Sequence, residues 1–388
     1  MAEEREAQRE WLDIGPPANR HPRLMPRRRR LAGLAAALMA VVVAGAVETS
    51  RDDYADQAGR YTAPPSTAPQ PTRAPLEPPV VMPGPTLPGA GSWEVYGRGE
   101  AEVVRLELGS GRITRTPVPQ LATSGPVTFL ATRTGVLARP VRAVPGYQVP
   151  DGEPARRLPH ELGEGGLILP GPERDQVWIT STSRYSSRSE MLLASLSSGW
   201  VRIQASLPAY TYGSVHPDGA GSYYVGSTGG AYLRVPGGYR RISMGTVLAA
   251  SRQSWLTAEC DQRLRCRHLL VDRRSGTRRE VRLLPSFDAV LTLVSLSPDS
   301  RYAAVAYRMG TQSPALHLID LRNGADREVA ARFDSVLAEE SLVWSPTGDH
   351  LAAIGREGRL VVIAPATAEI VSLDADVPPI SQLAAKPR

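Results

Sequence analysis

Short runs of apolar residues, each broken by a polar turn, follow one another along the chain from about residue 92 onward. The clearest copies are SLSPDSRYAAVAY at 295–307 and LVWSPTGDHLAAIG at 342–355. In both, an apolar strand is followed by a Ser-Pro turn and a second apolar strand, and the prolines Pro298 and Pro346 lie 48 residues apart. A strand–turn–strand unit that recurs about every 40–50 residues predicts the blades of a β-propeller.

A second landmark repeats at the same interval, an apolar strand that ends in an acidic residue four positions before a glycine. It occurs at 272–276 and 320–324, again 48 residues apart, and at 107–111. Glycine permits the positive φ of such turns, and the acid accepts hydrogen bonds from turn amides. With a weaker copy of the first landmark at 214–226, structural roles in blade turns are predicted for Pro217, Asp218, Pro298, Asp299, Pro346 and Gly348.

These landmarks predict an all-β domain over 92–375, folded as a six- or seven-bladed β-propeller. Seven candidate units can be laid out, at 93–120, 125–160, 165–205, 210–244, 246–283, 290–331 and 340–373. The first is the least complete, so six blades with N-terminal strands that close the ring are the alternative. Closure protects the strand edges that an open array would expose. Residues 376–388 are expected to form a C-terminal tail.

The turn sequences resemble the repeats of TolB-type, WD-repeat-like β-propellers, which have the approximate form W-S-P-D-G-x-x-L-A. Residues 344–348 (WSPTG) are the nearest copy, and residues 297–300 (SPDS) the next. The resemblance covers two units well and a third loosely. It implies the propeller fold and a preference for protein partners, and it implies no catalytic residue because the repeat motif is structural.

The N-terminal part of the chain predicts a membrane anchor and a spacer. Residues 31–47 are apolar and follow four consecutive arginines, so they are expected to form a short transmembrane helix with residues 1–30 in the cytoplasm. Signal-peptide cleavage near Ala46 is the alternative. Ten prolines between residues 61 and 90 predict that residues 48–91 form a disordered, extended linker. Both interpretations place the domain outside the plasma membrane.

Charge and cysteine content narrow the function classes. The net charge is +6, about half of it in residues 1–30, so we expect no clustered basic face and exclude a nucleic-acid partner. All basic residues except Lys386 are arginine, which is typical of a GC-rich bacterial genome. Cys260 and Cys266 are the only cysteines and flank a predicted hairpin turn, which predicts an extracytoplasmic disulfide.

The fourth unit contains the candidate binding patch. Six tyrosines fall within thirty residues, next to arginines, and such a surface suits a protein or a sugar. The alternative is that these tyrosines are ordinary strand residues. The patch comprises Tyr210, Tyr212, Tyr223, Tyr224, Tyr232, Tyr239, Arg240 and Arg241.

The chain contains no GxSxG, HExxH, phosphate-loop or GxGxxG motif, and its six histidines are scattered. We therefore predict no catalytic residue, metal or cofactor. The predicted function is a non-enzymatic, membrane-anchored scaffold outside the cell that binds an envelope protein or a cell-wall polymer. Two alternatives stay open. One is an extracellular propeller enzyme of hydrolase or lyase type acting on a small molecule or glycan. The other is a sensor that signals to a cytoplasmic partner.

Overall fold

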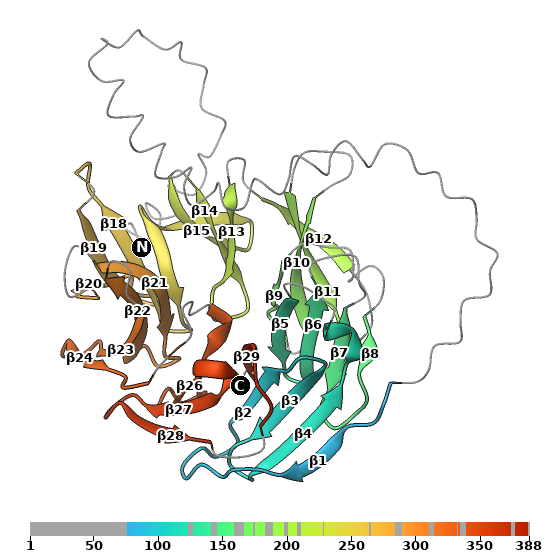
Figure 1. The fold of residues 1–388 in the computed structure, drawn as a ribbon. Coiled ribbons are helices and arrows are strands. Elements are labelled where there is room, and N and C mark those ends of the chain that lie inside the picture. The colour runs from blue at the N-terminus through green and yellow to red at the C-terminus, as the bar shows by residue number, and fades with distance from the viewer. Residues whose placement is uncertain are drawn as a thin grey trace. The chain divides into compact units, whose positions relative to one another are not determined.

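Seven β-sheets arranged in a ring around a central axis form the propeller (Figure 1). The computed structural model describes residues 76–122, 127–140, 146–158, 167–173, 175–182, 189–197, 201–207, 211–227, 229–263, 265–283, 289–309, 314–331, 333, 339–373 and 377–386. The predicted cytoplasmic tail and membrane helix, the linker up to residue 75, and Tyr210 lie outside these residues. In the part of the chain that the structure describes, no helix has the length and apolar character needed to cross a membrane.

Six of the blades consist of four consecutive antiparallel strands, ordered from the channel outward. Blades 2 to 4 contain β5 (Val127–Thr132), β6 (Gly135–Pro140), β7 (Tyr147–Pro150) and β8 (Arg156–Arg157), then β9 (Ile168–Pro170), β10 (Gln176–Thr182), β11 (Ser189–Ser195) and β12 (Val201–Ser206), then β13 (Thr211–Pro217), β14 (Tyr223–Ser227), β15 (Gly230–Val235) and β16 (Gly238–Ser243). The seven-bladed form of the prediction is therefore confirmed.

Blades 5 to 7 repeat the same order. They contain β17 (Thr246–Ala250), β18 (Ser254–Cys260), β19 (Cys266–Asp272) and β20 (Arg278–Val281), then β21 (Ala289–Leu296), β22 (Tyr302–Met309), β23 (Ala315–Asp320) and β24 (Ala325–Glu328), then β25 (Leu342–Trp344), β26 (Leu351–Ile354), β27 (Leu360–Ala364) and β28 (Glu369–Ser372). The described residues also contain three short 3-10 helices, η2 (Pro119–Leu121), η3 (Glu339–Ser341) and η4 (Arg356–Gly358). The predicted unit boundaries thus follow the blades closely.

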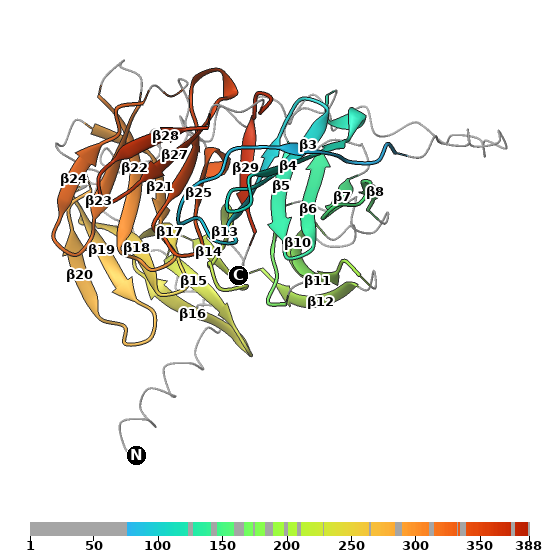
Figure 2. The same cartoon turned by 90° about the horizontal axis from the view of Figure 1, so that it is seen from below.

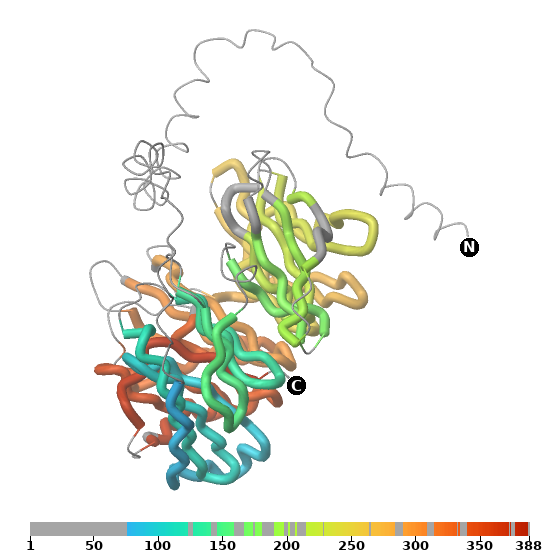
Figure 3. The backbone as a smooth tube through the Cα atoms, turned by 90° about the vertical axis from the view of Figure 1, so that its right-hand side faces the viewer, coloured from blue at the N-terminus to red at the C-terminus, as the bar shows by residue number. Residues whose placement is uncertain are grey.

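Blade 1 combines both ends of the described chain and closes the ring (Figures 2 and 3). Its innermost strand is β29 (Gln382–Ala385), which pairs with β2 (Glu94–Arg98), and β3 (Glu102–Glu107) and β4 (Arg112–Pro117) follow outward. β1 (Val80–Pro83) adds a fifth strand at the outer edge.

The structure therefore moves both predicted domain boundaries. β29 lies within the predicted C-terminal tail, and β1 lies within the predicted linker. Both segments have only four residues and carry no repeat signal. They become strands because β2 and β4 offer open edges with unpaired backbone groups.

The core consists of seven hydrophobic clusters, one between each pair of neighbouring blades. Strand β22 shows why a cluster forms on each side of a blade. Successive side chains of a strand point to opposite faces of the sheet, and therefore toward the two neighbouring blades. Ala304 and Ala306 pack toward blade 7, whereas Ala303 and Val305 pack toward blade 5. All clusters use residues from Leu76 onward, so the ring contains its complete core.

The two faces of the propeller are built from different connections. On the turn face, the chain joins the first strand to the second in blades 2 to 7, and the third strand to the fourth in every blade. On the opposite, connection face, the chain passes from the outermost strand of one blade to the innermost strand of the next. The turn face includes Pro217–Ser222 and Ser297–Arg301, and the connection face includes Met244 and the hairpin between Cys260 and Cys266.

The predicted disulfide is confirmed. Cys260 and Cys266 lie opposite each other at the ends of β18 and β19, and their sulfurs are bonded. We expect that replacing both cysteines by serine lowers the free energy of unfolding by about 2 kcal/mol, because the short loop regains entropy in the unfolded chain. Urea unfolding of the variant and of the reduced wild type checks this. Equal unfolding midpoints with and without reductant would contradict it.

A histidine beside the disulfide makes stability depend on pH. Burial on β19 lowers the pKa of His268, against an opposing effect of Glu280. The unfolded chain takes up this proton near its ordinary pKa of about 6.5, whereas the folded protein takes it up only at lower pH. Stability is therefore lost as the pH falls from about 6.5 through the lowered pKa. In His268→Gln, urea midpoints compared at about pH 5 and about pH 7 should differ less than in the wild type.

Candidate functional site

Cavities that share lining residues lie at the turn face and between the innermost strands. One cavity of about 560 Å³ lies on the turn face among the turns of blades 4 to 7 and the end of β29. We call it the channel mouth, and its lining includes Gly219, Arg252, Pro298, Trp344 and Lys386. A smaller cavity of about 170 Å³ among the turns of blades 2 to 4 shares Gly219 and Arg252 with it. A third, of about 330 Å³, continues inward between β13, β17 and β21.

Side-chain hydrogen bonds hold the turns around the mouth in a repeated arrangement. In blade 6 the amide of Tyr302 donates to Ser297 Oγ at 2.9 Å, and that hydroxyl donates to Asp299 Oδ1 at 2.6 Å. In blade 7 the amide of His350 donates to Ser345 Oγ at 3.0 Å. Both serines are almost completely buried. The prolines Pro298 and Pro346 occupy the next position in each turn, where their fixed φ suits the geometry.

Neighbouring turns also touch one another, which makes the mouth rigid. Gly348 has φ +81°, and a Cβ there would lie 2.8 Å from Asp299 Oδ1 of the next blade. Gly219 has φ +76°, and its Cβ would lie 2.9 Å from the backbone of Ser251. The hydroxyls of Ser251 and Ser300 are 2.6 Å apart. Glycine is required where backbones approach this closely.

A buried ion pair links the turns of blades 4 and 5. Asp218 accepts hydrogen bonds from the amides of Ala220 and Ser222 at 2.8 and 2.7 Å. Its other carboxylate oxygen lies 2.5 Å from Nη2 of Arg273, and this guanidinium lies 4.6 Å from the ring centre of Trp255. The Asp218 side chain is only 2 % exposed. Asp218, which was predicted as a turn residue, therefore also joins two blades.

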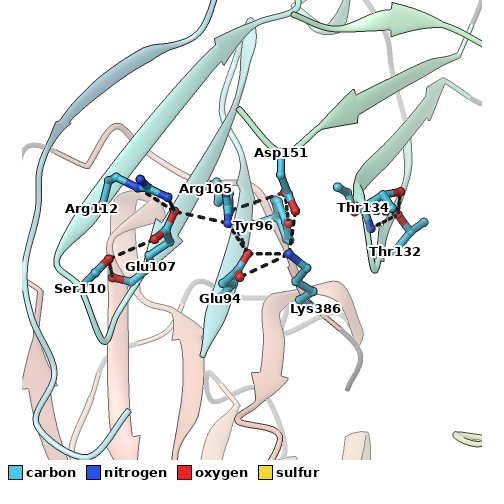
Figure 4. A network of polar contacts seen from close by, with 11 residues as sticks. Glu94, Tyr96, Arg105, Glu107, Ser110, Arg112, Thr132, Thr134, Asp151 and Lys386 are labelled. Atoms are coloured by element: carbon cyan, nitrogen blue, oxygen red, sulfur yellow. Dashed lines mark hydrogen bonds and ion pairs between the residues drawn. The ribbon is translucent and has the colours of Figure 1, made fainter. Parts of the chain in front are cut away.

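A second network closes the ring at the rim of the mouth (Figure 4). Lys386 Nζ lies 2.6 Å from Asp151 and 3.1 Å from Glu94, and Arg105 donates to Glu94 at 2.8 Å. Tyr96 donates to Asp151 at 2.5 Å, and burial together with this bond raises the pKa of Tyr96 far above its ordinary value. The chain's single lysine thus ties the last strand to blades 1 and 2.

Charge is distributed unevenly along the cavities. The two cavities of the turn face are lined by charges of both signs: Arg133, Glu173, Arg252, Asp299 and Lys386. The inner cavity between β13, β17 and β21 has no Asp, Glu, Lys or Arg in its lining. Among the described residues, no group of three or more His, Cys, Asp or Glu side chains is placed to hold a metal ion. A neutral passage with a charged, rigid rim suits an extended ligand with few charges.

The sequence analysis missed several of these lining residues, because their turns lack the Pro-Asp signature. Ser251–Gln253 and Gly171–Glu173 are examples. One signal was available, since Ser251 precedes Ser297 by nearly the interval that separates Ser297 from Ser345. Strand spacing alone could therefore have placed the turn of blade 5 at the mouth.

The predicted tyrosine patch is divided between two blade interfaces. Tyr223 packs toward blade 3 against Trp178, with ring centres 5.1 Å apart, and its hydroxyl lies 3.1 Å from that of Tyr239. Tyr224 packs toward blade 5. Tyr232 is partly buried and packs against the hydrophobic cluster that contains Tyr223. Arg240 and Arg241 are exposed on β16. Tyr212 is a residue of strand β13. The described tyrosine side chains fill the spaces between blades.

Comparisons with known proteins support the fold alone. No protein-family model and no curated protein matches the chain. Among solved structures, TolB from Acinetobacter baumannii is 14 % identical with a TM-score of 0.43, covering 80 % of this chain and 83 % of that one. The periplasmic gluconolactonase of Pseudomonas aeruginosa is 12 % identical with a TM-score of 0.43, covering 76 % and 98 %. A prolyl endopeptidase is 13 % identical with a TM-score of 0.50, covering 75 % of this chain and 51 % of its own.

The likeness to a prolyl endopeptidase corrects the prediction that the protein is not an enzyme. That prediction relied on the propeller fold and on the absence of linear catalytic motifs. A protein named as a prolyl endopeptidase shares the fold. Propellers can bring functional groups together from separate blades, so short motifs are a poor guide. The fold by itself does not decide between catalysis and binding.

Proposed function

We propose that this chain is an extracytoplasmic binding protein that recognises an extended segment of an envelope protein at the channel mouth. The membrane helix predicted at 31–47 would tether it, and the linker would connect the propeller to that helix. The observation that supports this most directly is the rigid channel mouth of about 560 Å³, which opens into an uncharged passage.

The rim has the composition that protein recognition favours. Trp344, Pro298 and Pro346 supply apolar surface, and Arg252 and Asp299 supply charges of both signs. A preformed surface binds with a smaller entropic cost than a mobile one, because few side chains become ordered on binding. The disulfide between Cys260 and Cys266 supports an oxidising, extracytoplasmic location.

Site-specific photocross-linking in intact cells tests the proposal. A photoreactive amino acid replaces Gln253, which is exposed at the mouth. The matched control carries it at Glu328, which is exposed on β24 at the outside of blade 6. We expect a discrete cross-linked product from position 253 and none of that size from position 328.

The nature of the product separates the possible partners. Peptides of a second protein in the mass spectrum of the digested product identify an envelope protein, which supports the proposal. Loss of the added mass after treatment with a wall-degrading muramidase identifies a cell-wall polymer, which contradicts it. The same set of products from both positions, or no product from position 253, also contradicts it.

A further inference from the structure

Positive charge is concentrated on blade 5, contrary to the expectation of no clustered basic face. Residues 246–283 contain nine arginines and four acidic residues, whereas the whole chain has a net charge of +6. Two of these arginines form ion pairs, Arg273 with Asp218 and Arg278 with Glu259. The other arginines are divided between the two faces of the propeller.

Three of the exposed arginines lie on the disulfide-bonded hairpin of the connection face. Arg263, Arg265 and Arg267 are all exposed. The amides of Arg263 and Arg265 donate to Asp261 Oδ1 at 2.8 and 3.0 Å, so this acid also fixes the loop. The hairpin is thus a rigid, positively charged projection.

Exposed apolar side chains lie on the same face. Met244 is 62 % exposed and stands two residues before Thr246, which pairs with Ala258 close to the base of the hairpin. In the neighbouring blade 6, Val290 is 53 % exposed and pairs directly with Arg308, which is also exposed. Met244 precedes the innermost strand β17, and Val290 belongs to the innermost strand β21. These two strands lie side by side. We call Met244, Arg263, Arg265, Arg267, Val290 and Arg308 the connection-face patch.

Among the described residues, acidic side chains offset the charge of the patch only in part. Glu259 is ion-paired with Arg278 at 2.9 Å and accepts a hydrogen bond from Ser243. Asp261 accepts hydrogen bonds from the hairpin amides and keeps its negative charge. Glu340 is exposed on the same face but belongs to the entry of blade 7. The four arginines of the patch outnumber Asp261 and Glu340, so its charge stays positive.

We infer that the connection-face patch docks onto an anionic lipid bilayer. Arginines attract acidic headgroups, and exposed apolar side chains enter the headgroup region. A soluble polyanion would use the arginines but would gain nothing from Met244 and Val290, so the combination favours a bilayer. This surface lies opposite the channel mouth, so the inference does not depend on the proposed function. The anchor predicted at 31–47 would raise the local concentration of bilayer at this face.

Vesicle binding of the segment Pro75–Arg388, which contains the whole ring and its core, tests the inference. The vesicles consist of phosphatidylcholine alone or of an equimolar mixture with phosphatidylglycerol. We expect binding only to the mixture. Arg263→Gln with Arg265→Gln should lower the partition coefficient by about 25-fold, at about fivefold for each arginine. Met244→Ser with Val290→Ser should lower it by about tenfold or more.

The matched control is Arg274→Gln with Arg322→Gln. It removes the same charge from exposed turns of blades 5 and 6 on the turn face, and its partition coefficient should stay within about twofold of the wild type. Circular dichroism confirms that each variant is folded. Equal binding to both kinds of vesicle, or an equal loss in the control, would overturn the inference. A third result would also overturn it: the patch binds immobilised polyphosphate through its arginines, and Met244→Ser with Val290→Ser leaves vesicle binding unchanged. That result would assign the surface to a soluble polyanion.

Discussion

A chain that ends at Ser381 is expected to lose the closed propeller. The truncation removes β29, which supplies the innermost strand of blade 1 and buries Leu383 and Ala384. It also removes Lys386, so Glu94 and Asp151 lose one of the two cations that they share and keep Arg105. An unpaired β2 edge and a missing piece of core together cost more than about 5 kcal/mol, which is comparable to the whole stability of a domain.

Urea unfolding and size-exclusion chromatography measure this effect. The truncated chain should elute as an expanded or aggregated species without a cooperative unfolding transition. A matched control that ends at Lys386 keeps β29 and its ion pairs and should unfold like the wild type. A cooperative transition with an unchanged midpoint in the chain ending at Ser381 would show that β29 does not hold the ring closed.

Replacing Asp218 with alanine is expected to give the largest loss of stability among single turn substitutions. The change leaves two turn amides without their acceptor and leaves the mostly buried guanidinium of Arg273 against Trp255 without its counter-ion. Breaking a buried pair by removing one partner costs about 3–5 kcal/mol. Asp218→Asn keeps an oxygen for the amides and should cost distinctly less.

The free energy of unfolding in urea measures both variants. The double variant Asp218→Asn with Arg273→Gln removes both charges and completes the comparison. If the ion pair dominates, the double variant should be nearly as stable as Asp218→Asn alone or more stable. A loss below about 1 kcal/mol for Asp218→Ala would mean that the link between blades 4 and 5 is not a major contribution.

Much of the fold could be predicted because its signals are local. Pro298, Asp299 and Gly348 mark turns whose hydrogen bonds form within a few residues, and the apolar strands between them alternate in the sequence. The disulfide was predictable for the same reason, since Cys260 and Cys266 flank one hairpin. The tyrosines of blade 4 were harder, because a strand tyrosine has the same sequence pattern whether it faces a partner or a neighbouring blade. Only the positions of Trp178 and Tyr239 show that Tyr223 lies between blades.

Both candidate surfaces combine residues from separate blades. The channel mouth combines Gly219, Arg252, Trp344 and Lys386, which are far apart in the chain and meet only when the ring closes. The connection-face patch likewise joins Met244 and Val290 to the hairpin arginines.

The repeated turn near the C-terminus by itself determined the blade, its spacing and the all-β class, because a strand and a turn are specified by a few adjacent residues. Only the tertiary structure decided the number of blades, the closure by β29 and β1, and the position of every cavity. Those features arise from open strand edges and from side chains of different blades that come together in space, and no local pattern encodes such contacts.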